Sequence, residues 1–176
     1  MSSSPQRAGV PGHDHSHDHD HGPCLAGIVA RAQAAFERQG LRLTPLRRDV
    51  LEEVASSHKA VGAYDVLDRL ARRDGRRLAP ISVYRALDTL VAAGVVHRLE
   101  SRNAFFACHT LHALDRRQIV LACDRCGAVA EVPHAAVFDG ITEVAAGVGF
   151  QMERALVEVI GACAACRAAT AAGQSA

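Results

Sequence analysis

Two cysteine pairs constrain this 176-residue chain more than any other feature. Cys123 and Cys126 form one C-x-x-C pair, and Cys163 and Cys166 form a second. A C-x-x-C turn brings two thiolates to one tetrahedral ion, so two such turns supply the four ligands of a closed zinc site. Gly127 follows the first pair, where a turn of this kind often needs a positive φ angle. The sequence therefore predicts a structural zinc site built from four cysteines.

The alternative interpretation of these cysteines is disulfide bonding or redox chemistry. The first residues are polar and no apolar segment follows them, so the N-terminus does not resemble a secretory signal. In a chain without such a signal, six cysteines favour metal over disulfides, and a redox motif needs only one pair. No apolar run reaches the length of a membrane span. We expect a soluble protein in the cytoplasm, without membrane contact.

The net charge of +1 conceals an uneven distribution. Residues 24–98 contain 13 basic and eight acidic side chains, whereas residues 1–23 and residues 99–176 each carry a net charge of −2. A basic segment between two acidic ones indicates that a polyanion would bind to the middle of the chain. The chain is long enough for two small domains, each with a modest core.

Both ends of the chain are predicted to be disordered tails. Residues 1–23 are rich in Ser, Pro and Gly, and histidine alternates with Asp or Ser from His13 to His21, so this segment cannot bury a core. Its imidazole and carboxylate groups would bind zinc or similar ions without fixed geometry, or the segment would only keep the chain soluble. Residues 169–176 form the second predicted tail.

Four helices are predicted between the N-terminal tail and the middle of the chain. Apolar residues with helical spacing mark the first helix at residues 25–39. Thr44 followed by Pro45 is typical of an N-cap and the first residue of a helix. A third helix is expected after Gly62, and a fourth at residues 80–94.

The fourth helix carries the argument for nucleic-acid binding. Ser82 is expected to cap its start, and its apolar face has helical spacing. The opposite face presents Tyr84 and Arg85, as a helix that enters the major groove requires, because arginine can bond to guanine and tyrosine can contact phosphate or a thymine methyl group. Residues 95–108 then have the pattern of a β-hairpin of the size of a wing. Together these elements predict a winged helix-turn-helix domain.

Four ordered stretches resemble the ferric uptake regulator family of metal-dependent repressors, most nearly its zinc uptake regulator branch. The stretches are Arg42-Leu43-Thr44-Pro45-Leu46-Arg47, Val83-Tyr84-Arg85-Ala86-Leu87-Asp88-Thr89-Leu90, Gly94-Val95-Val96-His97 and Cys123-Asp124-Arg125-Cys126-Gly127. The resemblance implies an α+β protein with an N-terminal winged helix-turn-helix domain at residues 24–107. It also implies a small C-terminal αβ dimerisation domain at residues 108–168 that carries the four-cysteine zinc site.

The resemblance further implies a homodimer whose two winged helices bind a palindromic operator in double-stranded DNA when a sensory metal is bound. The DNA-binding residues would be Tyr84, Arg85, Thr44 and Arg47. The C-terminal pattern agrees with an αβ domain, because it predicts three strands and one helix. The strands are expected at residues 118–122, 128–132 and 150–160, and the helix at residues 135–146, with Val137, Phe138, Ile141, Val144 and Ala145 facing inward.

A second, sensory zinc site at the hinge between the domains is also implied by the resemblance. The matching positions here are His97 in the wing, Cys108 at the end of the hairpin and Glu131 after the zinc knuckle. A thiolate in this set favours zinc over ferrous iron or manganese, whose sites are built from imidazole and carboxylate groups. Taken singly, each residue also fits a role without metal, as a phosphate contact, a buried apolar group or an exposed carboxylate.

The fourth sensory ligand departs from the family pattern. The zinc branch usually has a histidine eight residues after the cysteine, and this chain has Arg116 there. His112 is our predicted substitute and His109 the alternative, because a residue directly beside a ligand usually points away from the same ion.

These features predict a zinc-responsive repressor of zinc uptake genes, with two Zn²⁺ ions per subunit and no small-molecule substrate. A regulator of the same family that senses iron or another metal is the alternative within the family. A zinc buffer or chaperone would explain the histidine-rich tail but would not need the Tyr84–Arg85 helix or the wing. An enzyme is not expected, since the sequence lacks the motifs of a catalytic zinc site.

Overall fold

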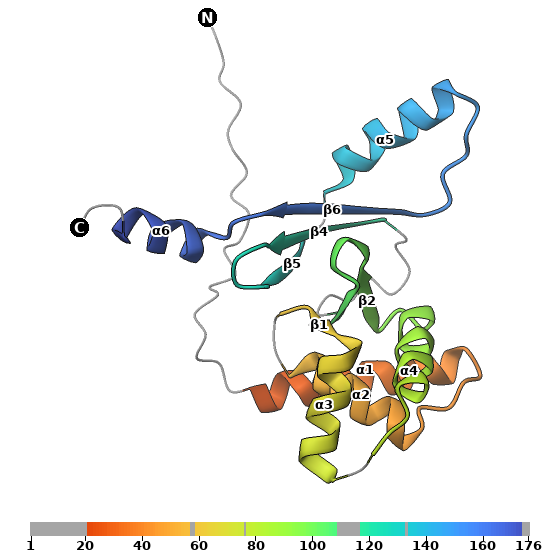
Figure 1. The fold of residues 1–176 in the computed structure, drawn as a ribbon. Helices are drawn as coiled ribbons and strands as arrows, with labels where there is room; N and C mark the ends of the chain where they lie inside the picture. The colour runs from red at the N-terminus through yellow and green to blue at the C-terminus, as the bar shows by residue number, and fades with distance from the viewer. Residues whose placement is uncertain (1–20, 57–58, 76, 109–116, 133, 174–176) are drawn as a thin grey trace, which may run out of the picture.

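The computed structural model describes residues 21–56, 59–75, 77–108, 117–132 and 134–173. They form an α+β structure with a helical lobe and a C-terminal lobe, which lie below and above the wing in Figure 1. The predicted fold class is confirmed. Among the described residues, no helix combines the length and apolar character needed to span a bilayer.

The helical lobe contains four helices, as the sequence predicts. They are α1 (His21–Arg38), α2 (Pro45–Ala55), α3 (Ala63–Asp74) and α4 (Pro80–Ala92). Their apolar stripes meet in one core, in which Phe36, Leu51 and Leu87 have no exposed surface. Thr44 is the N-cap of α2, as expected, and its hydroxyl accepts a hydrogen bond from the amide of Arg47.

Two details of these helices differ from the sequence-based expectation. The prediction that Ser82 caps the fourth helix is wrong, because α4 begins at Pro80 with Ala79 as its N-cap, and the fixed φ angle of proline starts the helix earlier. The first helix begins at His21, so residues 21–23 are helical where a tail was expected. Pro23 is compatible with this start because it lies in the first turn of α1.

The wing is an antiparallel hairpin of β2 (Val96–Leu99) and β3 (Ala104–Ala107), joined by the 3₁₀ turn η1 (Glu100–Arg102). This confirms the predicted hairpin. A two-residue strand, β1 (Val61–Gly62), pairs with the outer edge of β3, giving the order β1-β3-β2. The sequence analysis missed β1 because two residues are too few to form a period.

The C-terminal lobe is built on a three-stranded sheet of β4 (Arg117–Cys123), β5 (Val129–Val132) and β6 (Ala155–Gly161), in the order β5-β4-β6. Strand β4 pairs with β5 antiparallel and with β6 parallel, and α5 (Ala135–Gly147) lies in the connection from β5 to β6. A final helix, α6 (Ala164–Gly173), follows β6. Residues 169–173 are therefore helical where a disordered tail was expected.

Helix α5 buries less of its apolar face than the sequence predicts. Of the five residues expected to face inward, only Phe138 is buried, while Val137 is 39% and Val144 is 74% exposed. Figure 1 shows α5 at the end of the C-terminal lobe that is remote from the helical lobe. Its apolar stripe is therefore not covered within the described part of this chain.

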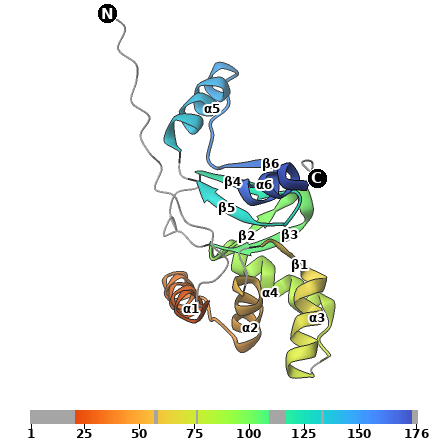
Figure 2. The same ribbon diagram turned by 90° about the vertical axis from the view of Figure 1, so that its left-hand side faces the viewer.

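A small apolar cluster joins the wing to the C-terminal sheet. Leu99 and Phe106 of the wing pack with Val120 and Ala122 of β4, and all four are buried. The views in Figures 1 and 2 both place the wing directly against this sheet. The amide of Ala60, which precedes β1, also donates a hydrogen bond of 3.1 Å to the carbonyl of Gly127, in the turn after β4.

Candidate metal centres and nucleic-acid interface

The four paired cysteines converge on one point at the end of the C-terminal sheet. Cys123 ends β4, and the parallel pairing of β4 with β6 places it beside Gly161, close to the second pair. The four Sγ atoms all lie within 4.8 Å of one another. Gly127 closes the first turn with a φ angle of 74°, as the sequence analysis expected.

The geometry of this cluster fits a tetrahedral zinc ion. The Sγ atoms of Cys126 and Cys163 are 3.8 Å apart. Two ligands at about 2.3 Å from one ion with tetrahedral angles are also about 3.8 Å apart. The backbone amides of Cys126 and Cys163 donate to Cys123 and lower the pKa of its thiol to about 6, so a thiolate is available at neutral pH. Conversely, a hydrogen bond with Cys163 raises the pKa of Cys166.

A second cluster lies at the junction of the two lobes. His97 comes from β2, Cys108 follows β3, and Glu131 lies on β5. Their ligand atoms all lie within 4.8 Å of one another. The Nε2 atom of His97 is 3.0 Å from Oε1 of Glu131, and the Sγ atom of Cys108 is 3.9 Å from Oε2 of the same carboxylate. Three of the predicted sensory residues are thus brought together from three separate segments.

This second cluster of His97, Cys108 and Glu131, called the hinge cluster below, is shielded from water. The side chains of His97 and Glu131 are 14% and 9% exposed, and the imidazole packs against the ring of Phe106 at 5.3 Å between centroids. Burial acts to lower the pKa of His97, but hydrogen bonds and electrostatic interactions with Cys108 and Glu131 raise it to about 9. A polar set of this composition, held under apolar cover, matches the soft and borderline ligands that zinc prefers.

The sequence analysis missed Gln118, whose Nε2 atom lies 3.3 Å from Nε2 of His97. Nothing in the pattern of β4 sets this glutamine apart, because its position beside His97 arises only when the wing docks on the sheet. The two candidates for the fourth ligand, His112 and His109, lie outside the described residues. Their assignment stays a prediction.

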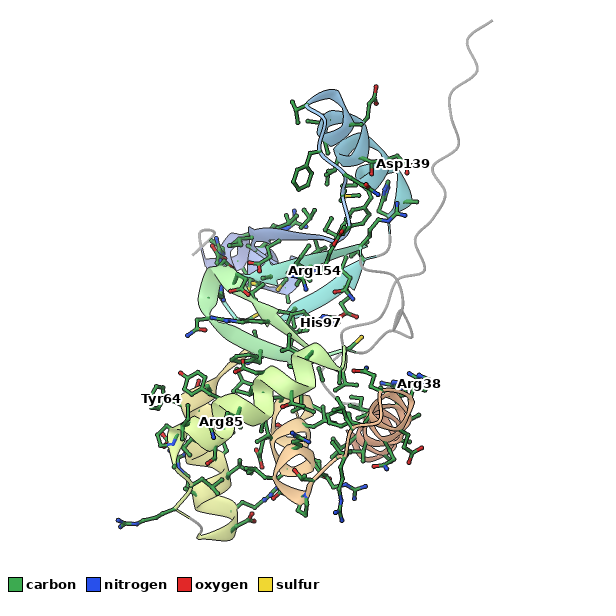
Figure 3. All side chains as sticks on the ribbon, turned by 90° about the vertical axis from the view of Figure 1, so that its right-hand side faces the viewer. Arg38, Tyr64, Arg85, His97, Asp139 and Arg154 are labelled. Carbon is green, nitrogen blue, oxygen red and sulfur yellow. The ribbon has the colours of Figure 1, made fainter. Side chains whose placement is uncertain are left out.

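The predicted recognition helix presents its polar face away from the core. Arg85 is exposed on α4, and Tyr84 beside it packs edge to face with Tyr64, at 6.2 Å between ring centroids. Tyr64 is 63% exposed, and Figure 3 shows it near Arg85 on the same side of the helical lobe. The sequence analysis missed Tyr64 because it belongs to α3. Its exposure as a large aromatic side chain is the signal that finds it.

Thr44 and Arg47 have structural partners of their own. The Thr44 hydroxyl caps α2, and the Arg47 guanidinium donates to the carbonyl of Arg42 at 2.6 Å and lies over the ring of Phe36. Both side chains are only partly buried and so keep a surface for a partner. Their role in DNA binding stays a prediction.

A winged helix, a cysteine-histidine-glutamate cluster at its hinge and a four-cysteine knuckle together define a two-lobed, metal-binding winged-helix protein. The model of the ferric uptake regulator family matches residues 38–160, and the chain belongs to this family. The zinc uptake regulation protein of Escherichia coli (strain K12) is 38% identical over 139 residues, which cover 79% of this chain and 81% of that protein.

Two solved structures resemble this one closely. A zinc uptake regulator complexed with zinc and DNA has a TM-score of 0.77 and 36% sequence identity, over 84% of this chain and 97% of that chain. Holo XcZur has a TM-score of 0.71 and 41% identity, over 82% of this chain and 99% of that chain. The family predicted from the motifs is therefore confirmed.

Proposed function

We propose that this chain is a zinc-responsive transcriptional repressor that binds operator DNA as a zinc-loaded homodimer and controls zinc uptake genes. The observation that carries the proposal is the convergence of His97, Cys108 and Glu131 at the junction between the lobes. The names and bound components of the similar proteins, zinc and DNA, support the same function. Because operator DNA lies in the cytoplasm, we assign the protein to that compartment.

Two zinc sites per subunit with different roles follow from the positions of the two clusters. The four cysteines all belong to the C-terminal lobe, so their role is to stabilise that lobe. The hinge residues come from both lobes and their connection. When bound there, zinc supplies a positive charge that an imidazole, a thiolate and a carboxylate share. His112, or else His109, would complete the set.

The hinge residues can switch DNA binding through geometry alone. His97 moves with the wing and α4, whereas Glu131 moves with the C-terminal sheet. When both side chains and Cys108 bind one zinc ion, the angle between the lobes is restricted. The two recognition helices of a dimer then keep the spacing that an operator requires. By linkage, the metal and the operator then strengthen each other's binding by the same factor.

Two exposed surfaces support the proposed binding of DNA and of a second subunit. Arg85, Tyr84 and Tyr64 are the proposed contacts to bases and phosphates, with Thr44 and Arg47 as further backbone contacts. The uncovered apolar stripe of α5 is the proposed dimer surface. A zinc buffer would use neither surface, and Cys108 in the hinge set argues against iron.

The test is operator binding by the wild-type protein at buffered free zinc, ferrous iron and manganese. The DNA probe is an operator duplex selected from promoter fragments of the source genome, with a scrambled duplex of equal length as the control. The proposal expects tight, selective binding with zinc at a far lower free concentration than with iron or manganese. Equal responses to all three metals, or binding that needs no metal, would refute it.

A further inference from the structure

Glu158 connects the C-terminal sheet to the tip of the wing. Its Oε1 atom accepts a hydrogen bond of 2.6 Å from the amide of Glu100, and its Oε2 atom accepts one of 3.1 Å from the amide of Ser101. Both amides belong to η1, the turn between the two strands of the wing. The first amides of such a turn have no acceptor within it, so a carboxylate from β6 supplies one.

Glu158 is ionised in this position. Burial acts to raise the pKa of its carboxyl group, but the hydrogen bonds from Ser101 and from the amide of Glu100 lower it below the ordinary value. Each of the two contacts is therefore a charge-assisted hydrogen bond, the stronger kind.

The sheet places Glu158 in line with the hinge cluster. Val120 on β4 pairs with Glu131 on β5 and with Glu158 on β6, so the three residues form one row across the sheet. Residues paired in this way project from the same face of a sheet. That face is the one that meets the wing, because Val120 packs against Leu99 and Phe106.

The row therefore contacts the wing at two points. At one end, Glu131 meets His97 within β2, and at the other end Glu158 meets η1, three residues further along the chain. A single contact would leave the wing free to pivot about it. Two contacts from one rigid sheet fix the direction of the wing as well as its distance.

We infer that Glu158 is a positioning residue that holds the wing in the arrangement in which His97, Cys108 and Glu131 lie together, and so lowers the zinc concentration at which the protein binds its operator. This inference rests on the proposed function. It adds a residue whose side-chain carboxylate accepts hydrogen bonds from the backbone amides of the wing. Glu158 touches neither the hinge cluster nor the proposed DNA face.

The expected effect is on zinc sensitivity rather than on maximal DNA binding. A contact that favours the metal-competent arrangement reduces the differential binding energy that the metal must supply. Loss of charge-assisted hydrogen bonds at a partly exposed site should raise the free zinc at half-maximal operator binding by about 3- to 10-fold. At saturating zinc, the variant should approach the operator affinity of the wild type.

The experiment uses the full-length dimer and the variants Glu158→Ala and Glu158→Gln, with Glu153→Ala as a matched control. Glu153 is an exposed glutamate in the bend just before β6, so its loss removes the same charge. Operator binding is followed by fluorescence anisotropy over a series of buffered free zinc concentrations. Hinge-site zinc affinity is measured separately, without DNA, by competition with a chromophoric chelator.

The inference expects a rightward shift of both curves for Glu158→Ala, a smaller shift for Glu158→Gln, which keeps one acceptor oxygen, and none for Glu153→Ala. Equal curves for Glu158→Ala and Glu153→Ala would overturn it. Loss of the dimer or of the structural zinc in both Glu158 variants would also overturn it, because Glu158 would then be a folding residue. Absence of any zinc response in the wild type would instead refute the proposed function, while the chelator competition would still decide on Glu158.

Discussion

Replacement of Cys108 by alanine should weaken the zinc response and leave the fold intact. Cys108 is 8% exposed, and the loss of one buried sulfur atom should cost roughly 1 kcal/mol in the free energy of unfolding. A typical domain has a free energy of unfolding of about 5–15 kcal/mol, so the variant should remain folded. The four-cysteine cluster shares no residue with the hinge cluster, so one zinc per subunit should also remain.

The effect on switching should be much larger than the effect on stability. Removal of a direct ligand should weaken zinc binding at the hinge by more than the ~100-fold that a lost supporting contact costs. A shift from 1:99 to 99:1 in favour of the DNA-competent arrangement requires about 10⁴-fold differential affinity. A 100-fold loss from that factor leaves the two arrangements about equally populated at saturation, and loss of the whole factor returns the ratio to 1:99. The fraction of DNA-competent protein at saturating zinc should therefore fall by at least about twofold and by up to about 100-fold.

The assay for Cys108→Ala combines a zinc count per subunit, thermal unfolding and an operator titration at buffered free zinc. Cys24→Ala is the control, since the sequence places this cysteine outside both sites. Wild-type zinc-responsive binding by Cys108→Ala would refute the sensory assignment. So would unfolding of the variant, because Cys108 would then be a structural residue.

Three further variants test the remaining assignments. The Arg85→Ala variant should remain a folded, zinc-loaded dimer and lose about 1–3 kcal/mol of operator binding energy per lost base contact. Unchanged selectivity in footprinting would show that α4 does not read the bases. Cys123→Ser should remove the structural zinc and unfold the C-terminal lobe, since metal binding there is worth about 10 kcal/mol or more; a stable dimer with full zinc content would contradict the four-cysteine site. Val144→Asp should split the dimer without destabilising the monomer, because Val144 is 74% exposed in the single chain. An intact dimer in sedimentation velocity would show that α5 is not the interface.

Local chemistry made much of this molecule predictable. Thr44 and Pro45 predict the start of α2 because their cap geometry is encoded within a few residues. The paired cysteines predict their own convergence because a closed metal site demands four ligands. The C-terminal lobe was harder, because the sequence of α5 shows that Val144 is apolar but not whether its own chain or a second subunit covers it.

The contacts between the lobes could not be predicted from local pattern. Gln118 and Glu158 both look like ordinary polar residues of half-exposed strands, and Tyr64 like a surface residue of α3. Each gains its role from a neighbour that is distant in sequence, as the separation of 58 residues between Glu158 and Glu100 illustrates. The family resemblance supplied His97, Cys108 and Glu131, but it did not supply the supporting residues around them.

Strand register connects the two proposed metal sites physically. Glu131, Val120 and Glu158 face the wing only in the observed pairing of β5, β4 and β6, and a slip of one residue would turn a strand's side chains to the opposite face. The same pairing places Cys123 at the end of β4 beside Gly161 at the end of β6, two residues before Cys163. A metal ion held by both cysteine pairs would therefore fix the register at the ends of these strands. If the four cysteines hold zinc as proposed, this site keeps Glu131 and Glu158 facing the wing, and loss of its zinc should also impair the zinc response of the hinge.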